Sequence, residues 1–159
     1  MSVIKTSVEP WIEDPLKRFV EEAGVVLALL LHPSGQVLAQ HGFTRAVDIM
    51  SACALAAAIQ VSSAELGRQL EGKPFSGLHH AGAKRQLFLA EATIPRARYI
   101  FLTVFDDASS LGLVRMYFED FTRNLATAAP KVTAPIEPTL NDNFERELNR
   151  NLAALFGRA

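Results

Sequence analysis

Two histidines and two aspartates stand side by side in this sequence, as His79-His80 and Asp106-Asp107. Paired carboxylates can share acid–base work, and imidazoles can bind a transition metal. Neither spacing suits that chemistry, because neighbouring residues in a strand point to opposite faces and two adjacent turn aspartates both face water. We therefore expect one histidine to lie against the sheet and the other to face solvent or a partner. The aspartates should form a turn or a helix cap.

Cys53 and Arg115 carry side chains that could act in chemistry if they were suitably placed, as a nucleophile and as an arginine finger for a GTPase. Cys53 lies in an Ala-rich stretch without an obvious basic neighbour, which favours a small buried hydrophobic residue. Arg115 lies within the first turns of a predicted helix, whereas a finger extends from an exposed loop. A structural or surface role is therefore the prediction for both residues.

The sequence lacks the short motifs of several catalytic classes, namely GxxxxGK[ST], GxGxxG after a strand, and GxSxG. Its single cysteine allows no disulfide framework, and its net charge of -1 gives no basic stripe for nucleic acid. No apolar run approaches the ~20 residues that a membrane span requires. We therefore expect a cytoplasmic, non-enzymatic protein without metal or cofactor that neither binds nucleic acid nor inserts into a membrane.

The hydrophobic pattern predicts the elements that position these residues. A first helix starts at Asp14 and Pro15 and ends at Gly24, and Trp11 and Ile12 either staple its entry or extend it backward. A second helix spans 49–70 after a cap at Asp48. Predicted strands cover 25–31, 36–40, 75–81, 86–94 and 99–105, and a third helix, capped by Ser109 or Ser110, follows from 111 to 125. Short loops and fully apolar strands predict an α/β sandwich, a five-stranded, mainly antiparallel sheet between helices.

Residues 99–115, YIFLTVFDDASSLGLVR, join an apolar strand to a helix through an acidic turn. This segment closely resembles the strand-to-helix junction of the Roadblock/dynein light chain family, in particular its bacterial, MglB-like branch. FSGLHHAGAKRQLFLA and HPSGQVLAQHG resemble the third and fourth strands and the first hairpin of that family. The match extends from about Leu16 to Leu125 and implies the Roadblock sandwich, with the element order α-β-β-α-β-β-β-α.

The resemblance also implies a homodimer, in which the helix 49–70 lies against its twin and the strand 75–81 pairs across a two-fold axis. The interface residues would then be Ala52, Ala56, Ile59, Ser63, Leu66, Phe75 and Leu78. Small residues on the helix, Gly67 among them, would let another backbone come close. They could equally fit the helix against its own sheet, and a heterodimer with a second Roadblock chain remains open.

The family's bacterial members act on small Ras-like GTPases in cell polarity and motility. The resemblance therefore implies a regulator of an MglA-like GTPase that activates hydrolysis or modulates exchange, without supplying an arginine finger. Two alternatives stay open. One is a Roadblock scaffold without effect on hydrolysis, and the other is a small-molecule sensor of the PAS or profilin-like kind.

The composition changes after Ala129, where three prolines within nine residues predict an extended linker over 130–141. Residues 142–159 predict an amphipathic helix with an apolar stripe of Phe144, Leu148, Leu152, Leu155 and Phe156. The expected domains are thus a Roadblock-like domain at 1–129, the linker, and this helix. A helix of that length is marginal alone, so we expect the stripe to dock on the GTPase or on its own domain.

Overall fold

The structure is a computed structural model that describes residues 9–42, 49–130, 149–151 and 154 of the 159-residue chain. The chain divides into two units, Met1–Ala129 and Pro130–Ala159. In the second unit, residues 149–151 and 154 are helical. The rest of that unit after Pro130 lies outside the described residues, including Asp142 and the predicted stripe of Phe144, Leu148, Leu152, Leu155 and Phe156. Asp48, the predicted cap of the second helix, also lies outside them.

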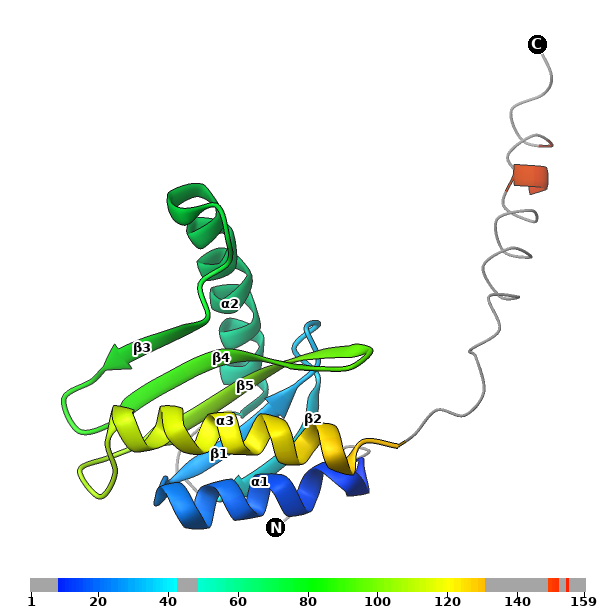
Figure 1. The fold of residues 1–159 in the computed structure, drawn as a ribbon. Helices are drawn as coiled ribbons and strands as arrows, with labels where there is room; N and C mark the ends of the chain where they lie inside the picture. Colours follow the sequence, from blue (N-terminus) through cyan, green and yellow to red (C-terminus); the bar gives the residue numbers. More distant parts are fainter. Residues whose placement is uncertain (1–8, 43–48, 131–148, 152–153, 155–159) are drawn as a thin grey trace. The chain divides into compact units, whose positions relative to one another are not determined.

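The described part of the first unit consists of three helices and five strands. In chain order these are α1 (Pro10–Ala23), β1 (Leu27–Leu31), β2 (Val37–Gly42), α2 (Ile49–Glu71), β3 (Gly77–Ala81), β4 (Gln86–Ile94), β5 (Ala97–Phe105) and α3 (Leu111–Ala128). The predicted order α-β-β-α-β-β-β-α is confirmed (Figure 1).

The strands form one sheet in the order β2-β1-β5-β4-β3, and every pairing in it is antiparallel. β2 and β3 are therefore its edges. β3 is shorter than its neighbour and pairs with β4 only from Gly77 opposite Ala90 to Ala81 opposite Gln86. An edge strand carries a row of backbone groups that can pair with a further strand.

Helices cover both faces of the sheet, and α1 and α3 lie side by side on the same face (Figure 1). The core beneath α1 and α3 is aromatic, because Phe19, Phe101 and Phe121 pack there with ring centroids 4.9 to 6.0 Å apart. The core beneath α2 contains Cys53, Leu29 and other aliphatic residues. The predicted three-layer arrangement is thus confirmed, since alternate residues of the central strands point to the two cores.

Two predicted boundaries differ from the structure for physical reasons. α1 begins at Pro10 rather than after Asp14, because Ile12 is fully buried and holds an additional turn on the core. Pro15 consequently lies inside the helix. β3 begins at Gly77 rather than at residue 75, because the preceding segment packs against α2.

The expectation that no segment is long and apolar enough for a membrane span is also wrong. By length and composition, α2 passes that test over Met50–Glu71, although the core helix of a soluble protein passes it as well. Only 33% of its apolar window is buried. The exposed remainder of α2 is therefore the feature of this fold that most needs an explanation.

Candidate interaction surface

α2 presents one side to the sheet, formed by residues with small side chains. Cys53, Ala56 and Ala57 are buried there in the core beneath α2. Ala64, seven residues after Ala57, is buried on the same face of the helix. Gly35 of the β1–β2 turn approaches the same part of the helix. A Cβ atom added to this glycine would lie 3.5 Å from the Cα atom of Ala54. Small side chains let the helix and the sheet come close.

Large apolar side chains on α2 point away from the sheet. Of the eight that are exposed in the described part of the chain, six lie on this helix: Met50, Leu55, Ile59, Val61, Leu66 and Leu70. A patch of this kind marks an interaction site more often than isolated apolar residues do.

These six side chains form two stripes. Leu55, Ile59, Leu66 and Leu70 share one face by their spacing of four, seven and four residues, and we name them the major stripe. Met50 and Val61, eleven residues or three helical turns apart, form the minor stripe. At 100° per residue the stripes flank the sheet-facing side of α2 on opposite sides. One straight contact with a single helix cannot cover both.

The predicted interface residues are placed differently from one another. Ile59 and Leu66 are exposed in the major stripe, with 37% and 51% of their surface accessible. Ala52, Ser63, Phe75 and Leu78 are half-buried. Ala56 is buried against the sheet, with only 5% of its surface accessible. Its small size therefore serves the packing of α2 within one protomer.

Gly67 likewise serves an intramolecular contact. A Cβ atom there would lie 2.4 Å from the backbone nitrogen of Phe75 and 2.8 Å from the carbonyl oxygen of Lys73. The chain that returns from α2 to β3 thus passes directly against the helix at this glycine. This close approach places Phe75 and the edge strand beside α2.

The two histidines of β3 lie on opposite faces of the sheet, as predicted. The Nε2 atom of His79 lies 2.7 Å from Oε1 of Gln86, and its ring stacks on Phe105 in the aromatic core. His80 is exposed and pairs in register with Leu87, which packs against the core under α2. Among the described residues, no group of three or more His, Cys, Asp or Glu could hold a metal ion.

The other chemically interesting residues have structural environments. Asp106 accepts a hydrogen bond from the backbone nitrogen of Ala108 at 3.0 Å, and Asp107 is exposed. Cys53 is fully buried, and burial raises the pKa of its thiol to about 11, which keeps it protonated at neutral pH. Arg115 is exposed within α3, a helix that covers the face opposite α2.

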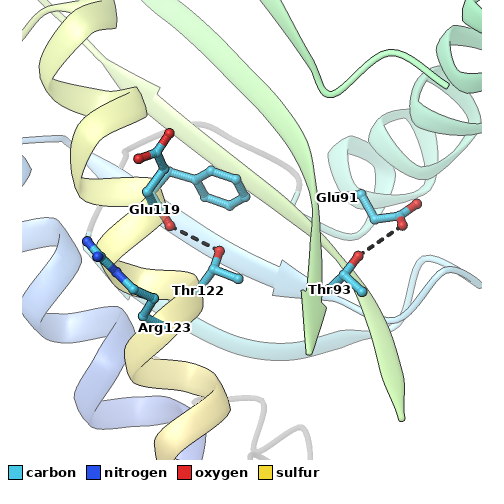
Figure 2. Close-up of a pocket in the computed structure, with 6 residues that line it drawn as sticks. Glu91, Thr93, Glu119, Thr122 and Arg123 are labelled. Carbon is cyan, nitrogen blue, oxygen red and sulfur yellow. Dashed lines mark hydrogen bonds between the residues drawn. The ribbon is translucent and has the colours of Figure 1, made fainter. Parts of the chain in front are cut away.

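A shallow hollow of about 400 Å³ lies between β4 and α3, lined by Glu91, Thr93, Phe118, Glu119, Thr122 and Arg123 (Figure 2). Most of its polar groups are already bonded to neighbours. Thr93 donates to Glu91 at 3.1 Å, Thr122 donates to the carbonyl of Phe118 at 3.0 Å, and Arg123 pairs with Asp120. A small-molecule site needs polar groups that converge on the ligand, so this hollow does not favour the sensor alternative.

One residue that sequence reasoning missed is Gln60, which has 6% of its surface exposed on the sheet-facing side of α2. It continues the row Cys53, Ala57, Ala64 and Gly67, whose spacing of four, three, four and three residues marks a buried face. The signal was present, since Gln60 is the polar member of an otherwise small and apolar row.

Comparison with known proteins places this geometry in a family. The Roadblock/LC7 domain matches residues 12–105. None of the curated proteins matches the chain. Among solved structures, Myxococcus xanthus MglB is 26% identical with a TM-score of 0.65, over 73% of this chain and 92% of that one.

Two further solved structures show the same fold. The gliding protein MglB of Thermus thermophilus is 24% identical, with a TM-score of 0.67 over 80% of this chain and 94% of that one. An MglB with a tetrameric arrangement is 23% identical, with a TM-score of 0.67 over 81% and 94%. The chain therefore belongs to the Roadblock/LC7 family, within which it is similar to MglB.

Proposed function

We propose that this chain is a homodimeric, non-enzymatic regulator that binds a small Ras-like GTPase of the MglA type and changes its nucleotide cycle. The observation that carries the proposal is the pair of exposed apolar stripes on α2, next to the edge strand β3. The 26% identity to Myxococcus xanthus MglB supports the choice of partner class.

The major stripe supports the homodimer. Leu55, Ile59, Leu66 and Leu70 form a continuous apolar line over more than four helical turns, which suits antiparallel packing against an identical helix. β3 lies at the sheet edge close to α2, so the same two-fold axis would pair it with its twin. That pairing would conceal an edge that otherwise invites aggregation.

The minor stripe supports a second partner. Met50 and Val61 are 72% and 61% exposed, and they flank the opposite side of α2 from the major stripe. A dimer formed through the major stripe leaves them accessible. An open apolar surface of this kind fits a folded protein better than a small molecule, which binds in concave sites.

The reaction chemistry in this proposal belongs to the GTPase. Arg115 lies on the face of the sheet opposite α2, so it has no part in the proposed contact. The dimer would act by stabilising one arrangement of the GTPase's own residues. The predicted stripe at 144–156 adds a second, tethered contact with the GTPase.

The test mixes the purified protein with the Ras-like GTPase encoded nearest to it, and measures binding and single-turnover phosphate release. Val61→Glu should weaken binding at least tenfold, because a charge would be desolvated in the contact, whereas Ser62→Glu on the exposed polar side should not. Arg115→Ala should change the rate only slightly, since loss of a true finger costs about 10³ or more.

Two other results would distinguish a regulator from a scaffold or refute both. Binding without any change in hydrolysis or exchange would show a scaffold instead of a regulator. Absence of binding to GTP-loaded and GDP-loaded GTPase alike would refute the proposal.

A further inference from the structure

The hairpin formed by β3 and β4 carries basic residues on a segment that has no acidic ones. Between Glu71, the last residue of α2, and Glu91 in β4, the sequence contains neither aspartate nor glutamate. Lys73, Lys84 and Arg85 lie in this interval, and all three are exposed. Within the described part of the chain, none of the three forms an ion pair. We name them the hairpin cations, and their charge is open to a partner.

The backbone that carries two of these cations is held in one conformation. The backbone nitrogen of Gly82 donates to the carbonyl oxygen of Arg85 at 2.8 Å and closes the turn between β3 and β4. A Cβ atom added to Gly82 would lie 2.6 Å from that same oxygen, so glycine is required here. The turn therefore presents Lys84 and Arg85 at a fixed end of the sheet.

The layer on the other side of the sheet has the opposite charge. Residues 9–23 and 106–128, which form α1, α3 and the turn before α3, carry nine acidic and four basic residues, a net charge of -5. Residues 24–42 and 49–105, which form the sheet and α2, carry three acidic and six basic residues, a net charge of +3. The domain is thus electrically polar, and α2 lies on its positive side (Figure 1).

The number and spacing of the hairpin cations indicate what kind of anionic partner they suit. A protein that binds duplex DNA typically contacts about six to ten phosphates, and a lipid-binding cluster typically has about four to eight Lys or Arg residues. One protomer offers fewer, and the length of β3 separates Lys73 from Lys84 and Arg85. A few separated cations fit an acidic region on a folded protein better than they fit a polyanion.

We propose that the hairpin cations attract an acidic surface of the GTPase and speed its association with this protein. The inference rests on the proposed GTPase partner and adds the chemistry of the surface that this partner presents. Complementary charge raises association rates by about 10 to 10³-fold, and the acidic layer disfavours approach from the wrong side. The attraction extends over ~8 Å at physiological ionic strength, so the bound GTPase need not touch the turn itself.

Charge reversal in the turn tests this role. The double variant Lys84→Glu, Arg85→Glu reverses two hairpin cations, and the control variant Lys17→Glu, Arg115→Glu makes the same change in net charge on the acidic layer. Stopped-flow kinetics measures association with the Ras-like GTPase encoded nearest to this protein, from about 20 to 500 mM sodium chloride. At the lowest salt the turn variant should associate about tenfold more slowly or worse, and the control variant should change far less. The difference should shrink as salt rises, because salt screens the attraction.

The two double variants should keep the fold and the oligomeric mass of the wild type, since all four positions are exposed in one protomer. Circular dichroism and light scattering check this. A turn variant that associates as fast as the wild type, or a wild-type rate that is independent of salt, would overturn the inference and leave the regulator intact. Absence of any binding of the wild type to the GTPase would refute the proposed function, and this inference with it. Binding to a DNA duplex or to anionic liposomes that the turn variant loses would assign the cations to a polyanion and overturn the inference as well.

Discussion

The hydroxyl of Ser109 donates a hydrogen bond to the carbonyl oxygen of Ala23 at 2.5 Å, which joins the turn before α3 to the last residue of α1. Gly24 follows in the left-handed conformation, with φ of 66°, and ends the helix. Ser110, the next residue, caps α3 by accepting a bond from the nitrogen of Leu113. Two adjacent serines thus fix the ends of two helices that pack together.

Ser109→Ala should lower the free energy of unfolding by about 1 kcal/mol, because the carbonyl of Ala23 loses its side-chain partner. Urea unfolding monitored by circular dichroism measures the change. Ser62→Ala, at an exposed position of α2, is the control and should be neutral or slightly stabilising. An unchanged unfolding midpoint for Ser109→Ala would show that this bond does not contribute.

Ile59→Glu and Leu66→Glu should convert the protein from dimer to monomer without unfolding it, since both side chains are partly exposed in one protomer. Burying each carboxylate in an apolar seam would cost several kcal/mol. Multi-angle light scattering checks the mass and circular dichroism the fold. Ala56→Glu should instead unfold the protomer, because Ala56 is buried against its own sheet.

The same variants separate a protein interface from a membrane contact. Wild-type protein should stay with the unbound fraction when it is floated with anionic liposomes, because its apolar stripes face a second copy and a protein partner. Flotation of the wild type, abolished by Leu66→Glu, would show that α2 contacts lipid instead.

Gly67→Ala should destabilise the domain by roughly 1 to 3 kcal/mol, because the added methyl group meets the backbone of Phe75. If that contact did not exist, replacing glycine by alanine within a helix would stabilise the domain by about 1 kcal/mol. The sign of the change in unfolding free energy therefore shows whether the contact exists. Denaturant unfolding gives the sign. Ser63→Ala, one helical turn earlier and half-buried, provides the comparison.

Cys53 predicts a defined pH dependence. Its thiol has a pKa raised from 9.0 to about 11 by burial, so only the unfolded state ionises between these values. Below pH 9 the contribution of the neutral thiol to stability is fully present, and it is lost as pH rises from about 9 towards 11. The stability difference between wild type and Cys53→Ala should therefore shrink over that range. If the unfolding free energies of the two proteins changed in parallel with pH over this range, the prediction would be contradicted.

Truncation after Ala129 should leave the melting temperature and the dimer nearly unchanged while weakening binding to the GTPase. The removed stripe of Phe144, Leu148 and their apolar neighbours is a second contact with the GTPase that is tethered to the first. Its high effective concentration near the bound GTPase would raise the affinity of the whole protein. Calorimetry and binding are measured on the same truncated protein. A clear loss of thermal stability with normal binding would place the stripe on its own domain.

Much of the fold follows from local sequence signals. The unbroken apolar runs of β1 and β5 predicted central strands because both of their faces are buried, and the acidic turn with two serines predicted the start of α3. Whether Trp11 and Ile12 extend α1 backward was left open, because Asp14-Pro15 is a strong local signal for a helix start. Burial of Ile12 outweighed it, and burial depends on residues far away in the sequence.

The interaction surface was less predictable for the same reason. Small residues on α2 suit a contact with the helix's own sheet as well as one with a second helix, and spacing alone does not separate these uses. The structure separates them, since Ala56 and Gly67 make intramolecular contacts and Ile59 and Leu66 remain exposed. No sequence pattern specified the path of the chain from α2 to β3, which passes directly against Gly67.

The separation of aromatic and aliphatic cores has a consequence for how such a domain can evolve. Phe19, Phe88, Phe101, Phe105 and Phe121 all lie in the core under α1 and α3, and the core under α2 has none of the buried phenylalanines. Substitutions on the outer sides of α2 therefore leave the aromatic packing intact. A duplicated copy of this gene could acquire a new partner through α2 while keeping its ability to fold. Divergence among paralogues should accordingly concentrate on the two stripes.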